Sequence, residues 1–214
     1  MSTKASRLTI IILLVISFIL AIALYPVMPD PMPSHWNAAG EVNGYMSKFW
    51  GLFLMPLITF GIVLIFIAIP HIDPLRSNIA QFIEAYNLMV VLFVVYMLYI
   101  YILTLLAAWG VPFNMTTMLL PAMGLLFVAI GYLLGQAKRN FFIGIRTPWT
   151  LTSDTVWAKT HRLGKWMFIS AGIVCIPCAF LGEVGFWVMM IAIMAAAIVP
   201  IVYSYILWKR DNPG

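Results

Sequence analysis

Long runs of apolar residues alternate along the chain with short polar segments. A helix that crosses the hydrocarbon core of a bilayer needs roughly twenty consecutive apolar residues, and six runs have about this length without a Lys, Arg, Asp or Glu. These runs are continuously apolar, whereas the strands in the wall of a membrane β-barrel alternate apolar and polar residues. The pattern therefore predicts an all-α fold, a polytopic transmembrane helical bundle with six spans: residues 8–25, 49–70, 88–109, 115–135, 166–182 and 185–207.

Composition places the whole chain in the membrane class. Of the 214 residues, 64% are hydrophobic and 9% are charged, against about 45–50% and about 25% in soluble domains. The mean hydropathy is +1.02, so too few polar residues are present to cover a soluble core. Two cysteines exclude a disulfide-stapled secreted scaffold. We expect one integral membrane domain, residues 1–214, in a multi-pass protein of the cell membrane. The first span should be retained, because its apolar run continues past the signal-peptidase-like residues 21–23.

The basic residues predict the orientation, because they collect on the cytoplasmic side of membrane proteins. With both termini inside (N-in, C-in), eleven of the twelve Lys and Arg residues are cytoplasmic, and Lys48 alone lies outside. The net charge of +5 is thus chiefly a topology signal rather than a sign of nucleic-acid binding, with attraction to anionic lipids as a second interpretation. This orientation places an outer cap, residues 26–48, between spans one and two. A cytoplasmic signature loop, residues 136–165, lies between spans four and five.

The outer cap is rich in residues that restrict the backbone. Four of the thirteen prolines lie in residues 26–33. Because proline fixes its own φ and biases the residue before it, a stiff extended arm is expected there. Asn43-Gly44 is a strong tight-turn signal, and residues 37–40 resemble a second turn. The cap is predicted to be a hairpin or a compact unit packed on the outer helix ends.

Polar and aromatic residues of the cap are the first group of candidate site residues. They form either a structural lid with interfacial aromatic anchors or a recognition site for a peptide or another partner. A third interpretation, a divalent-cation site, has only weak candidates in Asp30, His35 and Glu41, whose spacing matches no metal motif. The candidates in the cap are Asp30, His35, Trp36, Asn37, Gly40, Glu41, Gly44 and Tyr45.

The cytoplasmic signature loop combines an apolar segment with a predicted amphipathic helix. Phe141–Arg146 is apolar and is expected at the membrane interface or under the bundle, and Pro148 ends any helix before it. Thr152 or Ser153 can cap a new interfacial helix over residues 154–163. The helical spacing then places three residues on one face of this helix: Trp157, Thr160 and His161.

Three roles are open for the second group of candidate residues. Basic side chains can grip phosphate headgroups, Arg146 can close a structural clasp onto loop carbonyls, or the loop can form a docking surface for a partner. A rigid Thr-Pro-Trp turn at residues 147–149 is unnecessary for headgroup contact alone. The candidates in the loop are Arg146, Thr147, Pro148, Trp149, Trp157, Thr160, His161 and Arg162.

The spans carry packing signals and little chemistry. Gly131 and Gly135, with Gly124 one heptad earlier, predict the close approach of another helix of the same chain. Cys175 and Cys178 have the spacing of a redox motif but lie mid-span, where a thiol in apolar surroundings is inert. The sequence contains no zinc-protease, nucleotide-binding or serine-triad motif. We therefore expect no catalytic residues, no cofactor and no enzyme activity.

The two loops together resemble the SdpI family of bacterial membrane immunity and signalling proteins. Residues 25–48 are similar to the small N-terminal module often found in that family, and residues 140–164 are similar to the family's own signature. The resemblance implies a protein that senses or neutralises a secreted toxic peptide at its outer face. It also implies recruitment of a transcriptional repressor at the inner face. The expected partners are membrane lipids, a toxic peptide outside and a repressor protein inside.

Two other classes of function stay open. Prolines lie within four of the spans, a feature also found in transporters, so a small-molecule or lipid transporter or flippase is the first alternative. The absence of charged residues from the spans speaks against it. The second alternative is a metal-dependent membrane enzyme with its metal in the outer cap. A polar cavity at mid-membrane would favour the first alternative, and a convergent set of metal ligands in the cap would favour the second.

Overall fold

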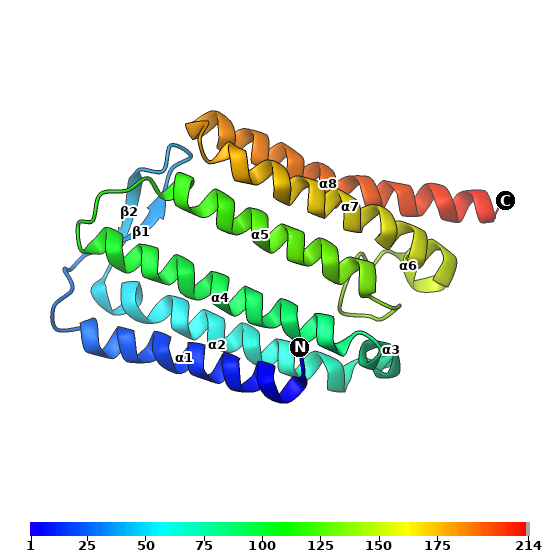
Figure 1. The fold of residues 1–214 in the computed structure, drawn as a ribbon, viewed down its shortest axis with the longest axis horizontal. Helices are drawn as coiled ribbons and strands as arrows, with labels where there is room; N and C mark the ends of the chain where they lie inside the picture. Colours follow the sequence, from blue (N-terminus) through cyan, green and yellow to red (C-terminus); the bar gives the residue numbers. More distant parts are fainter. Residues whose placement is uncertain (213–214) are drawn as a thin grey trace.

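A computed structural model describes residues 1–212 of the chain as a bundle of long helices that lie side by side along one axis (Figure 1). The long helices of this region are α1 (Thr3–Leu24), α2 (Lys48–Ile72), α4 (Ile83–Ala108), α5 (Met115–Gln136), α7 (Asp154–Cys178) and α8 (Gly182–Asp211). Its remaining elements are the short helices α3 (Arg76–Ala80) and α6 (Pro148–Thr152) and the strands β1 (Met32–Trp36) and β2 (Val42–Met46). The predicted helical bundle with a hairpin cap is confirmed.

Within residues 1–212, five helices are long and apolar enough to cross a membrane, namely α1, α2, α4, α5 and α8. The chain is therefore a multi-pass membrane protein. Helix α7 is not among the five, although it runs beside them along the bundle (Figure 1). The predicted count of six spans is thus not confirmed and stays a prediction. Large apolar side chains point away from the bundle, with Leu8 60%, Ile65 61% and Ile191 71% exposed, as expected of side chains that contact lipid.

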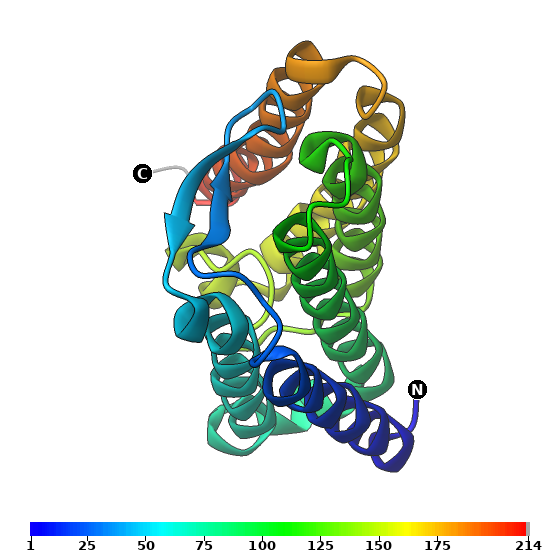
Figure 2. The same ribbon diagram turned by 90° about the vertical axis from the view of Figure 1, so that its left-hand side faces the viewer.

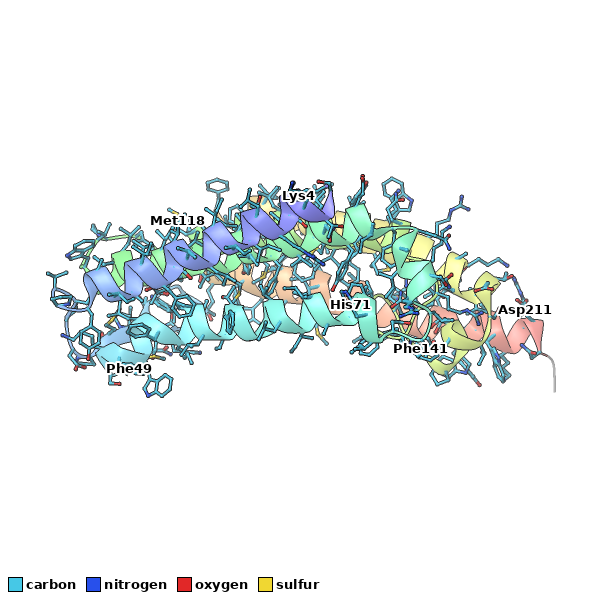
Figure 3. The ribbon with its side chains drawn as sticks, turned by 90° about the horizontal axis from the view of Figure 1, so that it is seen from below. Lys4, Phe49, His71, Met118, Phe141 and Asp211 are labelled. Atoms are coloured by element: carbon cyan, nitrogen blue, oxygen red, sulfur yellow. The ribbon has the colours of Figure 1, made fainter. Side chains whose placement is uncertain are left out.

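The two ends of the bundle differ in chemistry. One end, called the hairpin end below, carries β1 and β2 together with the α4–α5 and α7–α8 connections (Figure 1). The opposite end, called the basic end, carries α3, α6 and residues 137–147, and both termini of the described chain point toward it (Figure 1). Figure 3 shows Phe49 at the hairpin end and Lys4, His71 and Phe141 toward the basic end. The predicted orientation would place the hairpin end outside the cell.

The bundle consists of two packed halves, seen from the hairpin end in Figure 2. Helices α1, α2 and α4 share a core around Val63, Val90 and Val94, which continues toward the basic end to residues of α5, the loop and α7. Helices α5, α7 and α8 pack around Leu120 and Met189. The hairpin lies across the end of the bundle, from α2 toward α5 and α8 (Figure 2). It is therefore in a position to connect the halves.

Glycines allow α5 and α7 to pack very closely. A Cβ atom added at Gly124 would lie 2.5 Å from the carbonyl oxygen of Gly172, and one added at Gly131 would lie 2.7 Å from that of Lys165. Both distances are too short for a real side chain, so the two backbones are in direct contact. The predicted close approach within the chain is confirmed. Cys175 and Cys178 are buried free thiols in the same half of the bundle.

One prediction about the basic end is wrong. The expected separate interfacial helix is instead the first part of α7, which continues without a break to Cys178. Gly164 lies within this helix and packs under Ile145, whose Cδ1 would lie 2.5 Å from an added Cβ. No helix runs into Pro148 from the residues before it, in agreement with the prediction, and Pro148 itself is the first residue of α6, a position where its missing N–H is not needed. Ser153 caps α7 as predicted, since its side chain accepts a hydrogen bond from the N–H of Val156.

The cap also differs from its prediction in two details. Asn43 and Gly44 lie within β2 rather than in a tight turn, at a register irregularity opposite His35. The chain reverses at residues 37–41 instead. The expected extended arm over residues 26–33 begins with a turn, in which the N–H of Met28 donates to the carbonyl of Leu24 at 3.0 Å. Extended backbone is present from Met32 onward.

Candidate functional site

The turn of the hairpin is closed by one residue pair. The backbone N–H of Asn37 donates to the carbonyl of Glu41 at 2.9 Å. The N–H of Glu41 donates back to the side-chain oxygen of Asn37 at 2.9 Å, and the Asn37 amide reaches the Glu41 carboxylate at 3.1 Å. Gly40 completes the turn with φ of +82°, which favours glycine. The candidate residues Asn37, Gly40 and Glu41 thus build one rigid turn.

This turn is docked onto the first residues of α5. The side-chain amide of Asn114 donates to the carbonyl of Ala39 at 2.6 Å, and the Thr116 hydroxyl donates to the carbonyl of Ala38 at 3.1 Å. The backbone N–H of Met115 donates to the carbonyl of Gly40 at 3.3 Å. Asn114 also caps α5, because its side-chain oxygen accepts from the N–H of Thr117 at 2.9 Å. The cap and α5 therefore form one hydrogen-bonded unit.

The three weak metal candidates of the cap have separate partners. Asp30 accepts from the backbone N–H of Lys48 at 3.1 Å, His35 pairs with the Asn43 side chain at 2.6 Å, and Glu41 pairs with Asn37. Among residues 1–212, no group of three His, Cys, Asp or Glu side chains is placed to hold a metal ion. The metal interpretation of Asp30, His35 and Glu41 therefore finds no support.

A small apolar pocket of about 100 Å³ lies beneath the cap. Trp36 and Asn37 line it from the hairpin, Met123 from α5, and Phe186 and Met189 from α8. Methionine adapts its shape to irregular apolar partners. Tyr45 points away from the bundle with 62% of its surface exposed. The cap thus offers an exposed aromatic side chain and an adaptable apolar pocket at the same end.

At the basic end, His161 holds the loop against α7. Its Nδ1 lies 2.9 Å from the carbonyl of Trp157, and its Nε2 accepts from the backbone N–H of Ile145 at 3.0 Å. The two partners require a neutral imidazole with its proton on Nδ1. The ring also stacks on Trp157 with 3.9 Å between centroids. Burial lowers the pKa of His161 to about 4, against the raising effect of the bond to Trp157.

Gly144 makes this contact sterically feasible. Its φ of +109° lies in the region that favours glycine. A Cβ at this position would also collide with the Nε2 atom of His161. The loop passes directly over the imidazole only because residue 144 has no side chain. Trp157 fixes the other side, since its indole N–H donates to the carbonyl of Ala137 at 2.9 Å.

Helix α6 is held by a capping box and by contacts to α8. The side chains of Thr147 and Thr150 exchange hydrogen bonds with each other's backbone N–H groups, at 3.1 and 2.8 Å. The Thr147 hydroxyl lies 3.0 Å from that of Ser204, and the ring of Trp149 packs on Tyr205 with 5.0 Å between centroids. The Thr-Pro-Trp segment therefore attaches the loop to the last helix.

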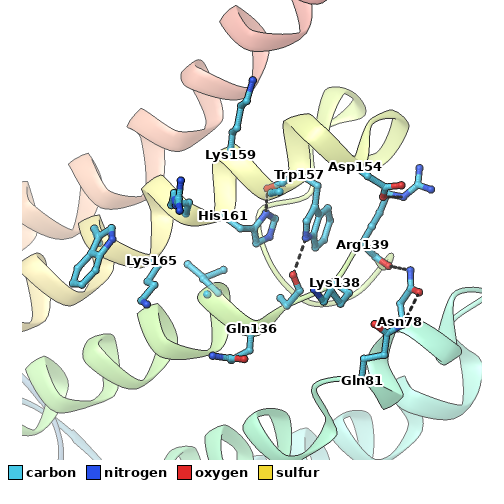
Figure 4. Close-up of a pocket in the computed structure, with 16 residues that line it drawn as sticks. Asn78, Gln81, Gln136, Lys138, Arg139, Asp154, Trp157, Lys159, His161 and Lys165 are labelled. Atoms are coloured by element: carbon cyan, nitrogen blue, oxygen red, sulfur yellow. Dashed lines mark hydrogen bonds and ion pairs between the residues drawn. The ribbon is translucent and has the colours of Figure 1, made fainter.

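The remaining candidates of the loop behave differently from one another. Arg146 donates to the carbonyl of Phe141 at 2.9 Å, which is the geometry expected of a clasp on loop carbonyls. Thr160 is fully buried. Arg162 is exposed and lies on the wall of an open cleft of about 750 Å³ between α3, the end of α5 and the first turns of α7 (Figure 4). The structure thus brings most of the predicted group into one clasp but places Arg162 outside it.

Sequence reasoning missed several polar residues that hold the loop. Asp73 is 2% exposed, and its carboxylate accepts from the backbone N–H groups of Leu75 at 2.6 Å and Phe141 at 2.9 Å. Asn140 is fully buried, and its oxygen accepts from the N–H of Ile143 at 2.6 Å. Arg139 pairs with Asp154 at 2.9 Å. An Asp immediately after an apolar span was a usable signal for Asp73, but its partner is 68 residues away.

Comparison with known proteins gives matches that include both candidate segments. The model of the SdpI/YfhL protein family matches residues 136–204, and a domain of unknown function, DUF1648, matches residues 12–60. The chain is 25% identical over 203 residues to the immunity protein SdpI of Bacillus subtilis (strain 168), which covers 94% of this chain and 95% of the relative. The chain is thus similar to the SdpI/YfhL family over residues 136–204 and to one immunity protein over most of its length.

The two family models match different parts of the molecule. The SdpI/YfhL match begins at the last residue of α5 and covers the loop clasp, α7 and most of α8. The DUF1648 match contains the whole hairpin and parts of α1 and α2. With five helices within residues 1–212 able to span a bilayer, this chain is a multi-pass protein of the cell membrane. No solved structure matches the chain.

Proposed function

We propose that this chain is a membrane immunity protein that protects its host cell from a secreted toxic peptide. The observation that carries the proposal is the match to an immunity protein along 94% of the chain and 95% of the relative. A match of this extent includes the cap, both halves of the bundle and the loop. The proposed action is binding and not catalysis, since the metal candidates of the cap are each engaged by other partners.

In this proposal the toxic peptide binds to the protein at the hairpin end. Toxic peptides that act on membranes carry apolar side chains, and the pocket lined by Met123, Phe186 and Met189 is apolar and adaptable. Tyr45 and Trp36 would supply amphipathic contact surface beside it. Orientation with the hairpin end outside follows from the distribution of basic residues.

Helix α5 is proposed to carry the signal between the two ends. It begins at Met115, which is bonded to the hairpin turn, and ends at Gln136, next to the residue that Trp157 holds. A peptide that shifts the cap would therefore act on the loop through one continuous helix. The loop clasp around His161 and the α6 segment would then present or hide the surface that recruits a repressor.

A transporter has less support. A cavity halfway along α1, α2 and α4, lined in part by Ser17, Thr59 and Tyr101, has a volume of only about 10 Å³. This space is too small for a substrate.

Survival of a sensitive bacterium tests the proposal. The chain is expressed in cells that lack their own immunity protein, and the cells are exposed to the toxic peptide. Survival above that of cells with the empty vector is expected. Equal survival, with the chain present in the membrane, would contradict immunity. A second readout, membrane recruitment of the co-expressed repressor with and without peptide, separates protection from signalling.

A further inference from the structure

The cleft at the basic end has a strongly one-sided charge. Five basic side chains line it, and Asp154 is the one carboxylate among the lining residues (Figure 4). That carboxylate is already paired with Arg139 at 2.9 Å. The other four basic side chains form no ion pair within residues 1–212. These are Lys138, Lys159, Arg162 and Lys165.

The backbone holds three of these cations on one wall of the cleft. Lys159, Arg162 and Lys165 follow at three-residue intervals along α7, so they lie on one side of the helix. The stem of Lys165 rests on Gly135 of α5, where an added Cβ would lie 2.7 Å from its Cδ. Neutral amides stand on the other walls, Gln81 just after α3 and Gln136 at the end of α5. The cleft thus offers both charges and hydrogen-bond donors to an anion.

The cleft opens where the apolar surface of the bundle begins. Trp166, which lines it, is 58% exposed, and the Lys165 ammonium lies 4.8 Å from the centroid of its ring. Beyond Trp166, α7 contains no further charged residue. Exposed tryptophan marks the level of lipid headgroups in membrane proteins. This position favours the phosphate of a lipid over a phosphate free in solution.

We propose that this cleft binds the headgroup of an anionic phospholipid. The phosphate lies among Lys159, Arg162 and Lys165, with Lys138 completing the positive wall and the amides of Gln81 and Gln136 as donors to headgroup oxygens. The acyl chains extend past Trp166 along the apolar part of α7. A lipid seated there contacts both α3 from the first half of the bundle and α7 from the second. Its binding therefore stabilises the relative position of the two halves at the basic end.

Native mass spectrometry of the purified full-length protein tests the site. The protein in detergent is titrated with phosphatidylglycerol or with phosphatidylcholine, and the bound lipids are counted. The variant Lys159→Gln/Arg162→Gln/Lys165→Gln should bind phosphatidylglycerol about a hundredfold more weakly, because each of the three basic residues near an anionic surface contributes about 1 kcal/mol, a factor of about five. Binding of phosphatidylcholine should change little. The charge-preserving variant Lys159→Arg/Lys165→Arg should keep the wild-type affinity for phosphatidylglycerol.

A matched control removes the same number of charges outside the cleft, by Lys4→Gln/Lys209→Gln/Arg210→Gln. This control should keep phosphatidylglycerol binding near the wild-type level. An equal loss in both triple variants would overturn the site, because attraction would then be spread over the whole basic end. Calorimetric titration with inorganic phosphate alone should show much weaker binding than the lipid. Phosphate binding as tight as that of phosphatidylglycerol would assign the cleft to a free anion and overturn the lipid proposal.

Discussion

The imidazole of His161 accepts a hydrogen bond from the backbone N–H of Ile145 at 3.0 Å, across sixteen positions of sequence. This bond needs an unprotonated Nε2, since a protonated ring has only donors. Because the pKa of His161 is lowered to about 4 by burial, the ring stays neutral and the loop stays attached to α7 at neutral pH. Hydrogen bonds from a side chain to a distant backbone group therefore hold the loop, and the cap is held in the same way.

Acid should destabilise the folded loop, because His161 binds a proton more readily in the unfolded chain than in the folded protein. The folded pKa of about 4 lies below the ordinary value of 6.5, so the unfolded state binds more protons between these values. Stability contributed by His161 is therefore full above about pH 6.5 and is lost as the pH falls toward 4, by roughly 3 kcal/mol in all. Thermal unfolding in detergent, followed by tryptophan fluorescence, measures this loss. The difference in Tm between wild type and His161→Gln should shrink from pH 7.5 to pH 5, whereas a constant difference would contradict the assigned role.

Gly144→Ala should weaken the loop clasp. The substitution places a Cβ against His161 in a backbone with φ of +109°, and such strain costs on the order of 1–3 kcal/mol. A lower Tm and faster proteolysis within residues 137–153 are expected. Gly61→Ala is the matched control, because an added Cβ there meets no atom within 4 Å. Equal stability of the two variants would show that the loop can move away from His161.

Asn114→Asp should separate the cap from α5 without removing the helix cap. Aspartate keeps an oxygen for the N–H of Thr117 and is a good N-cap. It loses the amide donor to the carbonyl of Ala39 and places a negative charge beside it. Hydrogen exchange over residues 36–45 should therefore accelerate, while exchange in α5 stays slow. Unchanged exchange in the cap would mean that Thr116 and Met115 hold it alone.

The helices were the most predictable part of this fold. Continuous apolar runs located the α1, α2, α4, α5 and α8 segments, since a bilayer selects strongly for length and hydropathy. The full extent of α7 was not predictable from its composition. Its polar first half and apolar second half look like two elements in the sequence, but they form one helix, in which Gly164 packs under Ile145.

The candidate sites were predicted as segments rather than as contacts. Trp157 and His161 were expected on one face of a helix, and both are buried against the loop as that spacing requires. The partners of the loop in α3, α8 and the α2–α3 connection are far away in the sequence. The partners of Asp73 and Ser204 in the loop could therefore not be predicted from the residues around them. The hairpin and its turn at residues 37–40 followed from the sequence, but the docking of this turn on Asn114 did not.

Orientation is open to a direct labelling test. Ser47, next to the hairpin, and Ser77, in α3, are both exposed, and the native cysteines are buried. A membrane-impermeant maleimide should modify Ser47→Cys in intact cells, and Ser77→Cys only after the cells are opened. The reverse pattern would invert the molecule and place the basic end outside.

The most direct measurement of the central claim is photo-crosslinking of the toxic peptide to the chain in living cells. A photoreactive phenylalanine analogue replaces Tyr45 at the hairpin end or Phe141 at the basic end, which are 62% and 46% exposed. If the cap meets the peptide, illumination should join the peptide to the chain carrying the analogue at position 45 and not at position 141. Crosslinks at position 141 alone, or none at position 45 in cells that the chain protects, would contradict recognition at the hairpin end.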